Sequence, residues 1–267
     1  MNALLQLKQI TKVFNEGTLD EKIALQSIDL TLAPGDFVTI IGSNGAGKST
    51  LMNMISGRLF PDTGSVLING KDVTEMSEHR RARYIGRVFQ DPLAGTAPNM
   101  TIEENLALAY GRTRKRTLQF GVTKKRREFF RETLQTLQLG LEDRLNAKVG
   151  LLSGGERQAL SLLMATFTNP DLLLLDEHTA ALDPARADLI TRLTGEIVSK
   201  SKLTTLMVTH NMEQALRLGN RLIMMDKGQI IFAASGEEKK KLTVEKLLQE
   251  FQRIRGSQLA SDRAVLV

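Results

Sequence analysis

A glycine-rich segment between an apolar run and a helical pattern has the residue types needed to bind phosphate. It reads Gly42-Ser43-Asn44-Gly45-Ala46-Gly47-Lys48-Ser49 and fits the pattern G-x-x-x-x-G-K-[ST] of a P-loop. Glycines let backbone N–H groups curl around phosphates, and a helix that starts here directs its positive end at them. The segment therefore predicts a Mg-nucleotide site in which Lys48 reaches the β- and γ-phosphates and Ser49 binds Mg²⁺, with Thr50 beside it.

Two carboxylates follow the most apolar short run of the chain. Leu172–Leu175 is typical of a strand buried on both faces, and Asp176 and Glu177 come directly after it. Alone, such a pair is more often the start of a loop than a catalytic pair. In a chain with a P-loop the preference reverses, because ligands collect at the carboxyl edge of a parallel sheet. We expect Asp176 to hold Mg²⁺ through water and Glu177 to orient and deprotonate the attacking water.

A third segment, Leu152-Ser153-Gly154-Gly155-Glu156, comes just before a helical pattern. Ser153 and Glu156 satisfy the capping-box pattern S-x-x-E, which is a purely structural explanation for them. Two glycines at the first helical positions nevertheless cost helix stability. Their presence is explained if bare backbone N–H groups must approach an anion.

The elements around these segments alternate between strand and helix. The strand patterns cover residues 4–14, 23–32, 37–41, 65–68, 172–175, 205–208, 222–225 and 229–232, and Asn69-Gly70 indicates a hairpin. Helical patterns cover residues 48–57, 184–199 and 212–218. This alternation predicts a parallel sheet wrapped by helices. The helical patterns between about residues 91 and 167 would be an insertion, and residues 236–267 a charged helical tail, within one domain spanning 1–267.

Composition excludes several classes of protein. No stretch approaches the ~18 consecutive apolar residues of a membrane-spanning helix. The N-terminus has no basic region followed by an apolar core, so we expect no secretory signal. The chain has no cysteine, which excludes disulfides and cysteine-based zinc sites and fits a reducing compartment.

The net charge of +6 is concentrated in the segment from Arg112 to Arg131, which holds nine basic residues. A solvated loop and helix face is one interpretation. Attraction to an anionic membrane surface or to nucleic acid are the alternatives. Aromatic residues make up only 4% of the chain and Trp is absent, which argues against stacking platforms for single strands.

The order of the motifs resembles that of ABC ATPases over residues 4 to 235. The P-loop is followed by Leu152–Gln158, by Leu172–Glu177 with Thr179–Asp183, and by Val208-Thr209-His210. The resemblance implies an α/β P-loop NTPase fold with a parallel-sheet core, an N-terminal antiparallel β subdomain and an inserted α-helical subdomain. It also implies that the chain hydrolyses ATP with Mg²⁺.

The resemblance assigns roles to four further residues. Phe14 is expected to stack on adenine, although it would also suit a strand core. Gln90 is expected to bind Mg²⁺ and to sense the γ-phosphate. His210 is expected to contact the γ-phosphate. Asp183 matches the loop that contacts the opposite subunit, and Asp183-Pro184 would also serve as a helix N-cap with proline at the first position.

His178 departs from the family pattern, in which most members have proline at this position. Loss of proline frees φ and restores an N–H beside Glu177. A histidine that titrates here could make Glu177 sensitive to pH near neutrality. A residue specific to one lineage, without such a role, is the alternative.

The resemblance also implies partners. The chain has one P-loop and one copy of the segment Leu152–Glu156, which we call the signature segment. In this family Ser153, Gly154 and Gly155 of one subunit cover the nucleotide bound by the other subunit. We therefore expect a head-to-tail dimer of identical chains that binds permease subunits at the cytoplasmic face of the inner membrane. The sequence Asp176–Asp183 is similar to that of importer ATPases paired with branched-chain-amino-acid-like permeases and lipoprotein binding components. Amino acids are the expected cargo, and a soluble ABC ATPase that acts on nucleic acid or ribosomes is the alternative.

Overall fold

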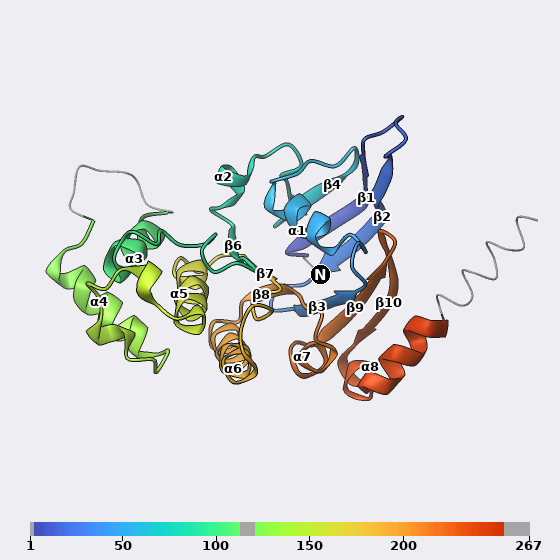
Figure 1. Ribbon diagram of the computed structural model, residues 1–267. Helices are drawn as coiled ribbons and strands as arrows, with labels where there is room; N and C mark the ends of the chain where they lie inside the picture. Colours follow the sequence, from blue (N-terminus) through green and yellow to red (C-terminus); the bar gives the residue numbers. More distant parts are fainter. Residues whose placement is uncertain (1–2, 113–120, 254–267) are drawn as a thin grey trace, which may run out of the picture.

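Two β-sheets form the framework of the computed structural model, which describes residues 3–112 and 121–253 (Figure 1). The larger sheet has the strand order β10-β9-β3-β8-β7-β6, and every neighbouring pair is parallel except β9 with β10. Its strands are β3 (Phe37–Gly42), β6 (Ile85–Val88), β7 (Leu172–Asp176), β8 (Thr204–Val208), β9 (Arg221–Asp226) and β10 (Gln229–Ser235). The predicted parallel-sheet core is confirmed.

The smaller sheet is antiparallel and has the order β2-β1-β4-β5. Its strands are β1 (Leu5–Phe14), β2 (Lys22–Leu32), β4 (Thr63–Ile68) and β5 (Lys71–Asp72). The predicted hairpin is present, because Ile68 pairs with Lys71 across Asn69 and Gly70, which both have positive φ. Two successive positive φ values are what a type I′ hairpin turn requires.

Three helices of the middle segment lie together at one side of the larger sheet (Figure 1). They are α3 (Ile102–Gly111), α4 (Lys124–Gln135) and α5 (Gly154–Thr166), with short 3-10 turns at Leu141–Asp143 and Val149–Leu151. The remaining helices are α1 (Lys48–Ser56), α2 (Glu78–Arg81), α6 (Pro184–Ser201), α7 (Met212–Arg217) and α8 (Gly236–Lys240), and residues 244–253 are helical too. Within the described ranges, no helix is both long and apolar enough to cross a membrane.

The structure corrects the predicted elements at β6 and in the segment that begins at residue 91. The strand β6 was not predicted, because its four residues include Gly86 and Arg87 and show no clear alternation. The helical pattern expected from residue 91 begins only at Ile102, since Pro92 and Pro98 favour turns in the segment between.

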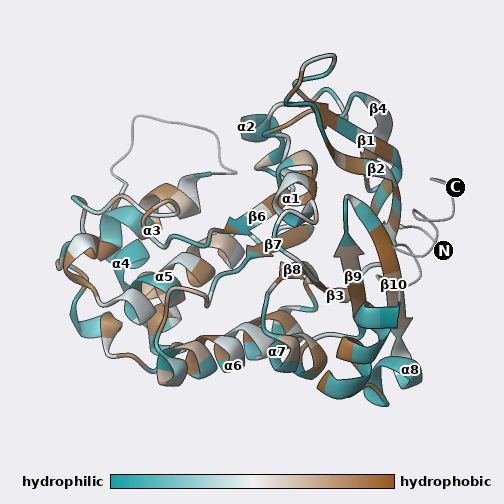
Figure 2. Ribbon diagram, turned by 45° about the vertical axis from the view of Figure 1, so that its right-hand side comes forward, coloured by the Kyte–Doolittle hydropathy of each residue, from teal (hydrophilic) through white to brown (hydrophobic). Residues whose placement is uncertain are grey.

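In Figure 2 the inner strands are largely brown, which marks hydrophobic residues, and α8, at the edge, is largely teal, which marks hydrophilic ones.

An aromatic cluster holds the helical subdomain together. It consists of Tyr110, Phe129, Phe130 and Phe167, whose ring centroids lie between 5.5 and 6.2 Å apart. These residues come from α3, from α4 and from the end of α5. Four of the six ring pairs are edge-to-face, and such contacts are worth about 0.5–1.5 kcal/mol per pair beyond burial. The cluster therefore fixes the orientation of α5, whose first turn holds the signature segment.

Candidate active site

The predicted phosphate loop connects β3 to α1 and leaves the start of that helix open. Gly47, the residue before α1, has φ 96°, and no side chain caps the first turn. A Cβ on Gly47 would lie 2.4 Å from the carbonyl oxygen of Ala24, so only glycine fits here. The first backbone N–H groups of α1 therefore remain available to an anion.

Lys48 lies across this loop and is only 6% exposed. Its Nζ donates hydrogen bonds to the carbonyl oxygens of Gly42 and Ser43, each at 2.9 Å. Burial lowers the pKa of the Lys48 amine, and the carboxylates of Glu177 and Asp176 oppose this shift. The structure thus brings the three predicted charged groups within electrostatic range of one another.

One cavity of about 310 Å³ contains most of the predicted nucleotide-binding residues. Its walls include Phe14, Lys22, the segment 44–50 and Glu177. Glu177 has φ 44°, a left-handed conformation that costs a non-glycine residue roughly 1–3 kcal/mol and is found at functional sites. Its N–H donates to the carbonyl oxygen of Val208 at 3.0 Å, which holds it against the end of β8. Glu177 therefore faces the phosphate loop from a fixed backbone position.

His210 lies beside Glu177 because β8 runs between β7 and β3. Nδ1 of His210 is 3.6 Å from Oε2 of Glu177, and the imidazole is 61% exposed. The strand order places the end of β8 between the phosphate loop and the strand that ends in Asp176. His210 thus faces open solvent with its ring close to the carboxylate.

Asp176 is held by Arg87, which the sequence analysis did not single out. One guanidinium nitrogen of Arg87 donates to Oδ2 of Asp176 at 3.1 Å and to Oδ1 of Asn53 at 2.9 Å. A second nitrogen donates to the hydroxyl of Ser56 at 3.0 Å. Arg87 therefore links β6, β7 and α1, and it leaves Oδ1 of Asp176 as the oxygen that could face a metal.

The predicted metal-binding residues offer only oxygen ligands, which suit Mg²⁺. Ser49 is exposed in the wall of the cavity, and Asp176 has one oxygen that Arg87 does not engage. Within the described ranges, no three or more His, Cys, Asp or Glu residues are grouped so that they could hold a metal ion by themselves. Mg²⁺ commonly takes one or two protein ligands together with phosphates and water, so the residues present fit this ion.

Several predicted residues lie outside the cavity wall, namely Gly42, Ser43, Gln90, Asp176, Asp183, His210 and the signature residues Ser153, Gly154 and Gly155. Gln90 is exposed two residues beyond β6. Asp183 is the N-cap of α6, and its Oδ1 accepts from the N–H of Arg186 at 3.1 Å. Asp183 therefore caps α6, with Pro184 at the first helical position, as the helix-capping explanation of this residue predicted.

The signature segment forms a complete capping box. The N–H of Ser153 donates to Oε2 of Glu156 at 2.7 Å, and the N–H of Glu156 donates to Oγ of Ser153 at 3.3 Å. A Cβ on Gly155 would lie 3.1 Å from the side chain of Arg186 in α6. This segment therefore packs against the start of α6 and contributes nothing to the phosphate-loop cavity of its own chain.

The structure corrects the idea that His178 titrates beside Glu177 near neutrality. The imidazole is 2% exposed, and its Nε2 lies 3.0 Å from the hydroxyl of Thr194 on α6. Burial lowers the pKa of His178 to about 4, so the ring is neutral at pH 7. His178 thus packs against α6 as a buried, uncharged residue.

Replacement of His178 by glutamine should flatten the dependence of stability on pH. Since the pKa is about 4 in the folded chain and 6.5 in the unfolded chain, the unfolded state binds more protons between these values. The contribution of neutral His178 to the free energy of unfolding is therefore complete above pH 6.5. It is lost as the pH falls towards 4, which lowers the free energy of unfolding by up to about 3 kcal/mol. Urea unfolding without nucleotide or metal, compared with wild type, measures this difference. The exposed His79→Gln variant is the control, and an equal pH dependence of wild type and His178→Gln would contradict the prediction.

Asp226 is a site residue that the sequence analysis missed. It is 2% exposed at the end of β9, and its Oδ1 accepts a hydrogen bond of 2.6 Å from the Ser43 hydroxyl. This contact fixes the phosphate loop to the larger sheet. The only local signal was an acidic residue directly after the apolar run Leu222–Met225.

Comparisons with known proteins identify the relatives of this chain. The family model described as ABC transporter matches residues 25–180. The chain is 41% identical to the tyrosine transport ATP-binding protein of Clostridioides difficile, over 93% of this chain and 99% of that protein. It is 35% identical to the methionine import ATP-binding protein MetN 2 of Enterococcus faecalis, over 86% of this chain and 64% of that protein.

Solved structures are similar over most of the chain. A dimeric ATP-binding cassette in a post-hydrolysis state with ADP and Pi has a TM-score of 0.75 at 29% identity, covering 86% of this chain and 98% of that one. The ADP conformation of another ABC transporter cassette has a TM-score of 0.76 at 29% identity, covering 94% and 99%.

The parallel sheet, the phosphate loop and the carboxylate that faces it define a P-loop ATPase with an inserted helical subdomain. Within that class, the chain belongs to the ABC transporter family of ATP-binding subunits, and it binds and hydrolyses ATP.

Proposed function

We propose that this chain powers a membrane transporter that imports an amino acid or a similar small solute. The observation that supports this most strongly is the 41% identity to a tyrosine transport ATP-binding protein over nearly the whole of both chains. Other relatives have names that refer to transport of methionine and of betaine or choline. The position of Glu177 in the phosphate-loop cavity supports a hydrolysing subunit over a passive one.

The positions of the individual residues support the following roles. Lys48 and the open N–H groups of α1 bind the β- and γ-phosphates, and Phe14, which also lines the cavity, stacks on adenine. Glu177 orients the attacking water and accepts its proton, while His210 contacts the γ-phosphate. Mg²⁺, held through Ser49, Gln90 and Asp176, would neutralise charge on the phosphates.

A second copy of the chain is proposed to complete each site. The cavity is lined by the phosphate loop and Glu177, whereas Ser153, Gly154 and Gly155 lie outside its wall. Dimeric cassettes among the similar structures support this arrangement. Two chains packed head to tail would place the signature segment of each over the nucleotide of the other, with Asp183 at the contact.

The permease is proposed to dock beside Gln90. A cavity of about 300 Å³ lies between the helical subdomain and the sheet core, with Ala109 and Met164 on one side and Arg87 and Phe89 on the other. Phe89 directly precedes Gln90, so a docked permease segment would touch the strand that leads to the site. The chain would then lie at the cytoplasmic face of the inner membrane, with an extracytoplasmic binding protein as a further partner of the transporter.

The soluble alternative, an ATPase that acts on nucleic acid or ribosomes, rests on the basic segment. Residues 113–120 of that segment lie outside the described residues. In the described part, Arg127 forms two hydrogen bonds of 2.6 and 2.9 Å with Glu103, and Arg126 lies over the ring of Tyr110. These two charges are engaged within the helical subdomain, whereas Lys124 and Lys125 are exposed, so the transport proposal rests on the relatives and not on this segment.

Purification of the chain from native membranes tests the proposal. We expect a permease to accompany it, because the permease and the ATPase would form one complex. The ATPase rate of that complex in liposomes should rise when tyrosine or another amino acid is supplied with the binding protein. Recovery of ribosomes or DNA in place of a membrane protein would decide for the soluble alternative.

A further inference from the structure

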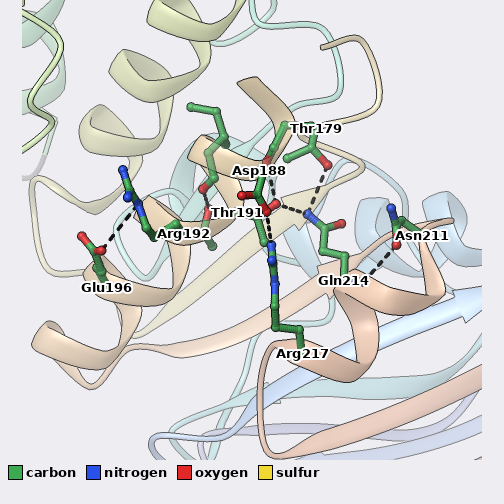
Figure 3. Close-up of polar contacts among 11 residues, drawn as sticks. Thr179, Asp188, Thr191, Arg192, Glu196, Asn211, Gln214 and Arg217 are labelled. Atoms are coloured by element: carbon green, nitrogen blue, oxygen red, sulfur yellow. Dashed lines mark hydrogen bonds and ion pairs between the residues drawn. The ribbon is translucent and has the colours of Figure 1, made fainter. Parts of the chain in front are cut away.

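Gln214 lies at the centre of a buried polar network next to the active site (Figure 3). It belongs to α7 and is 6% exposed. Its Oε1 accepts a hydrogen bond of 2.6 Å from the hydroxyl of Thr209. Its Nε2 donates to the hydroxyl of Thr191 at 2.7 Å and to that of Thr179 at 3.2 Å. One side-chain amide thus joins three separate segments of the chain.

Two of these partners are next to proposed catalytic residues. Thr209 directly precedes His210, and Thr179 follows Glu177 by two positions. The third partner, Thr191, lies on α6, the helix that begins after Asp183. We propose that Gln214 is a positioning residue that fixes His210 and the loop after Glu177 relative to each other. This inference rests on the proposed roles of Glu177 and His210.

The geometry around Thr209 shows how the amide would act on His210. The Thr209 hydroxyl accepts from the N–H of Asn211 at 3.1 Å while it donates to Gln214. Oδ1 of Asn211 in turn accepts from the N–H of Gln214 at 2.9 Å. His210 is therefore enclosed on both sides by residues of one hydrogen-bonded ring, although its own imidazole is exposed. Nδ1 of His210 lies 3.6 Å from Oε2 of Glu177, which is beyond hydrogen-bond distance. The orientation of the imidazole therefore depends on the backbone that the hydrogen-bonded ring holds in place.

The network also supports the left-handed backbone of Glu177. A non-glycine residue in this conformation persists only where its surroundings hold it. The hydrogen bond from Gln214 to Thr179 is a side-chain contact that joins this loop to α7. A buried amide with all its partners rigidifies such a site, whereas an unpaired one is costly. Loss of the amide should therefore loosen His210 and the Glu177 loop together.

The test is Gln214→Leu, which keeps the size of the side chain and removes both the donor and the acceptor. We expect kcat for ATP to fall about tenfold while KM changes less than about twofold, since Lys48 and the phosphate loop are not touched. In the His210→Ala background, the same substitution should lower the rate of single-turnover hydrolysis by a clearly smaller factor, because only the contact with the Glu177 loop is then left to lose. This lack of additivity is the signature of a residue that acts through His210.

A spectroscopic readout is available because the chain has only three histidines. In histidine-labelled protein, the ring signal of His210 should shift and broaden in Gln214→Leu, while that of His79 should not move. Thr179→Val is a milder second variant that removes only the bond to the Glu177 loop, and we expect it to lower kcat by a smaller factor.

Asp188→Asn is the matched control. Asp188 and Arg217 form an exposed ion pair of 2.8 Å that joins the same two helices, α6 and α7 (Figure 3). Such exposed pairs contribute little, so kcat should stay within about twofold of wild type. Wild-type kcat in folded Gln214→Leu, or an undiminished effect in the His210→Ala background, would overturn the inference. Wild-type turnover in His210→Ala alone would instead overturn the proposed role of His210.

Discussion

Replacement of Glu177 by glutamine should lower the turnover number for ATP by about 10²-fold or more and leave ATP affinity unchanged. The amide keeps the size of the carboxylate but cannot accept a proton from water. Glu177 lies in the wall of the cavity formed by residues 44–50, with its backbone fixed to Val208. Its loss should therefore affect the chemical step and not the binding step. Steady-state hydrolysis and equilibrium binding of ATP measure the two effects separately.

The same variant should accumulate an ATP-bound dimer. If hydrolysis opens the two subunits, a chain that binds ATP without hydrolysing it remains closed. Gel filtration with ATP should show a larger species for Glu177→Gln than for wild type, and the same species without nucleotide for both. Glu196→Gln, which removes a carboxylate that is 63% exposed on α6, should behave as wild type. Wild-type turnover in Glu177→Gln would remove this residue from the role of base.

Replacement of Lys48 by alanine should weaken ATP binding by roughly 10- to 100-fold. The ammonium group lies against the phosphate loop, hydrogen-bonded to the carbonyl oxygens of Gly42 and Ser43. Phosphate oxygens would receive charge-assisted hydrogen bonds from this group, and such bonds are about twice as strong as neutral ones. Since these contacts exist in the ground state, the loss should appear in the dissociation constant. Titration with a fluorescent ATP analogue measures it.

A matched control distinguishes a specific contact from a change in net charge. Lys71→Ala removes an exposed lysine on β5, outside the cavity, and should leave ATP affinity unchanged. Thermal unfolding without nucleotide should show that Lys48→Ala is folded. Unchanged nucleotide affinity in Lys48→Ala would contradict the assignment of the phosphate loop.

The local features of this chain could be predicted because short-range sequence encodes them. A buried strand, a glycine turn and a helix start are neighbours in sequence, so the phosphate loop was evident from residues 37–57. The hairpin at Asn69-Gly70 and the capping box of Ser153 with Glu156 also depend only on adjacent residues. The structure contains both the hairpin and the capping box at the residues that the sequence predicted.

The tertiary structure alone decided which distant side chains meet. Arg87 contacts Asp176 across 89 positions of sequence, and Gln214 contacts Thr179 across 35. Such pairs depend on the strand order, which places β8 between β3 and β7 and which hydrophobic periodicity does not encode. The same reason explains His178, which is adjacent to Glu177 in sequence yet packs on α6, because burial of its ring is set by a helix that begins six residues later. The sequence therefore determined that this chain has a phosphate loop, whereas only the fold decided which residues hold Asp176 and Glu177 in place.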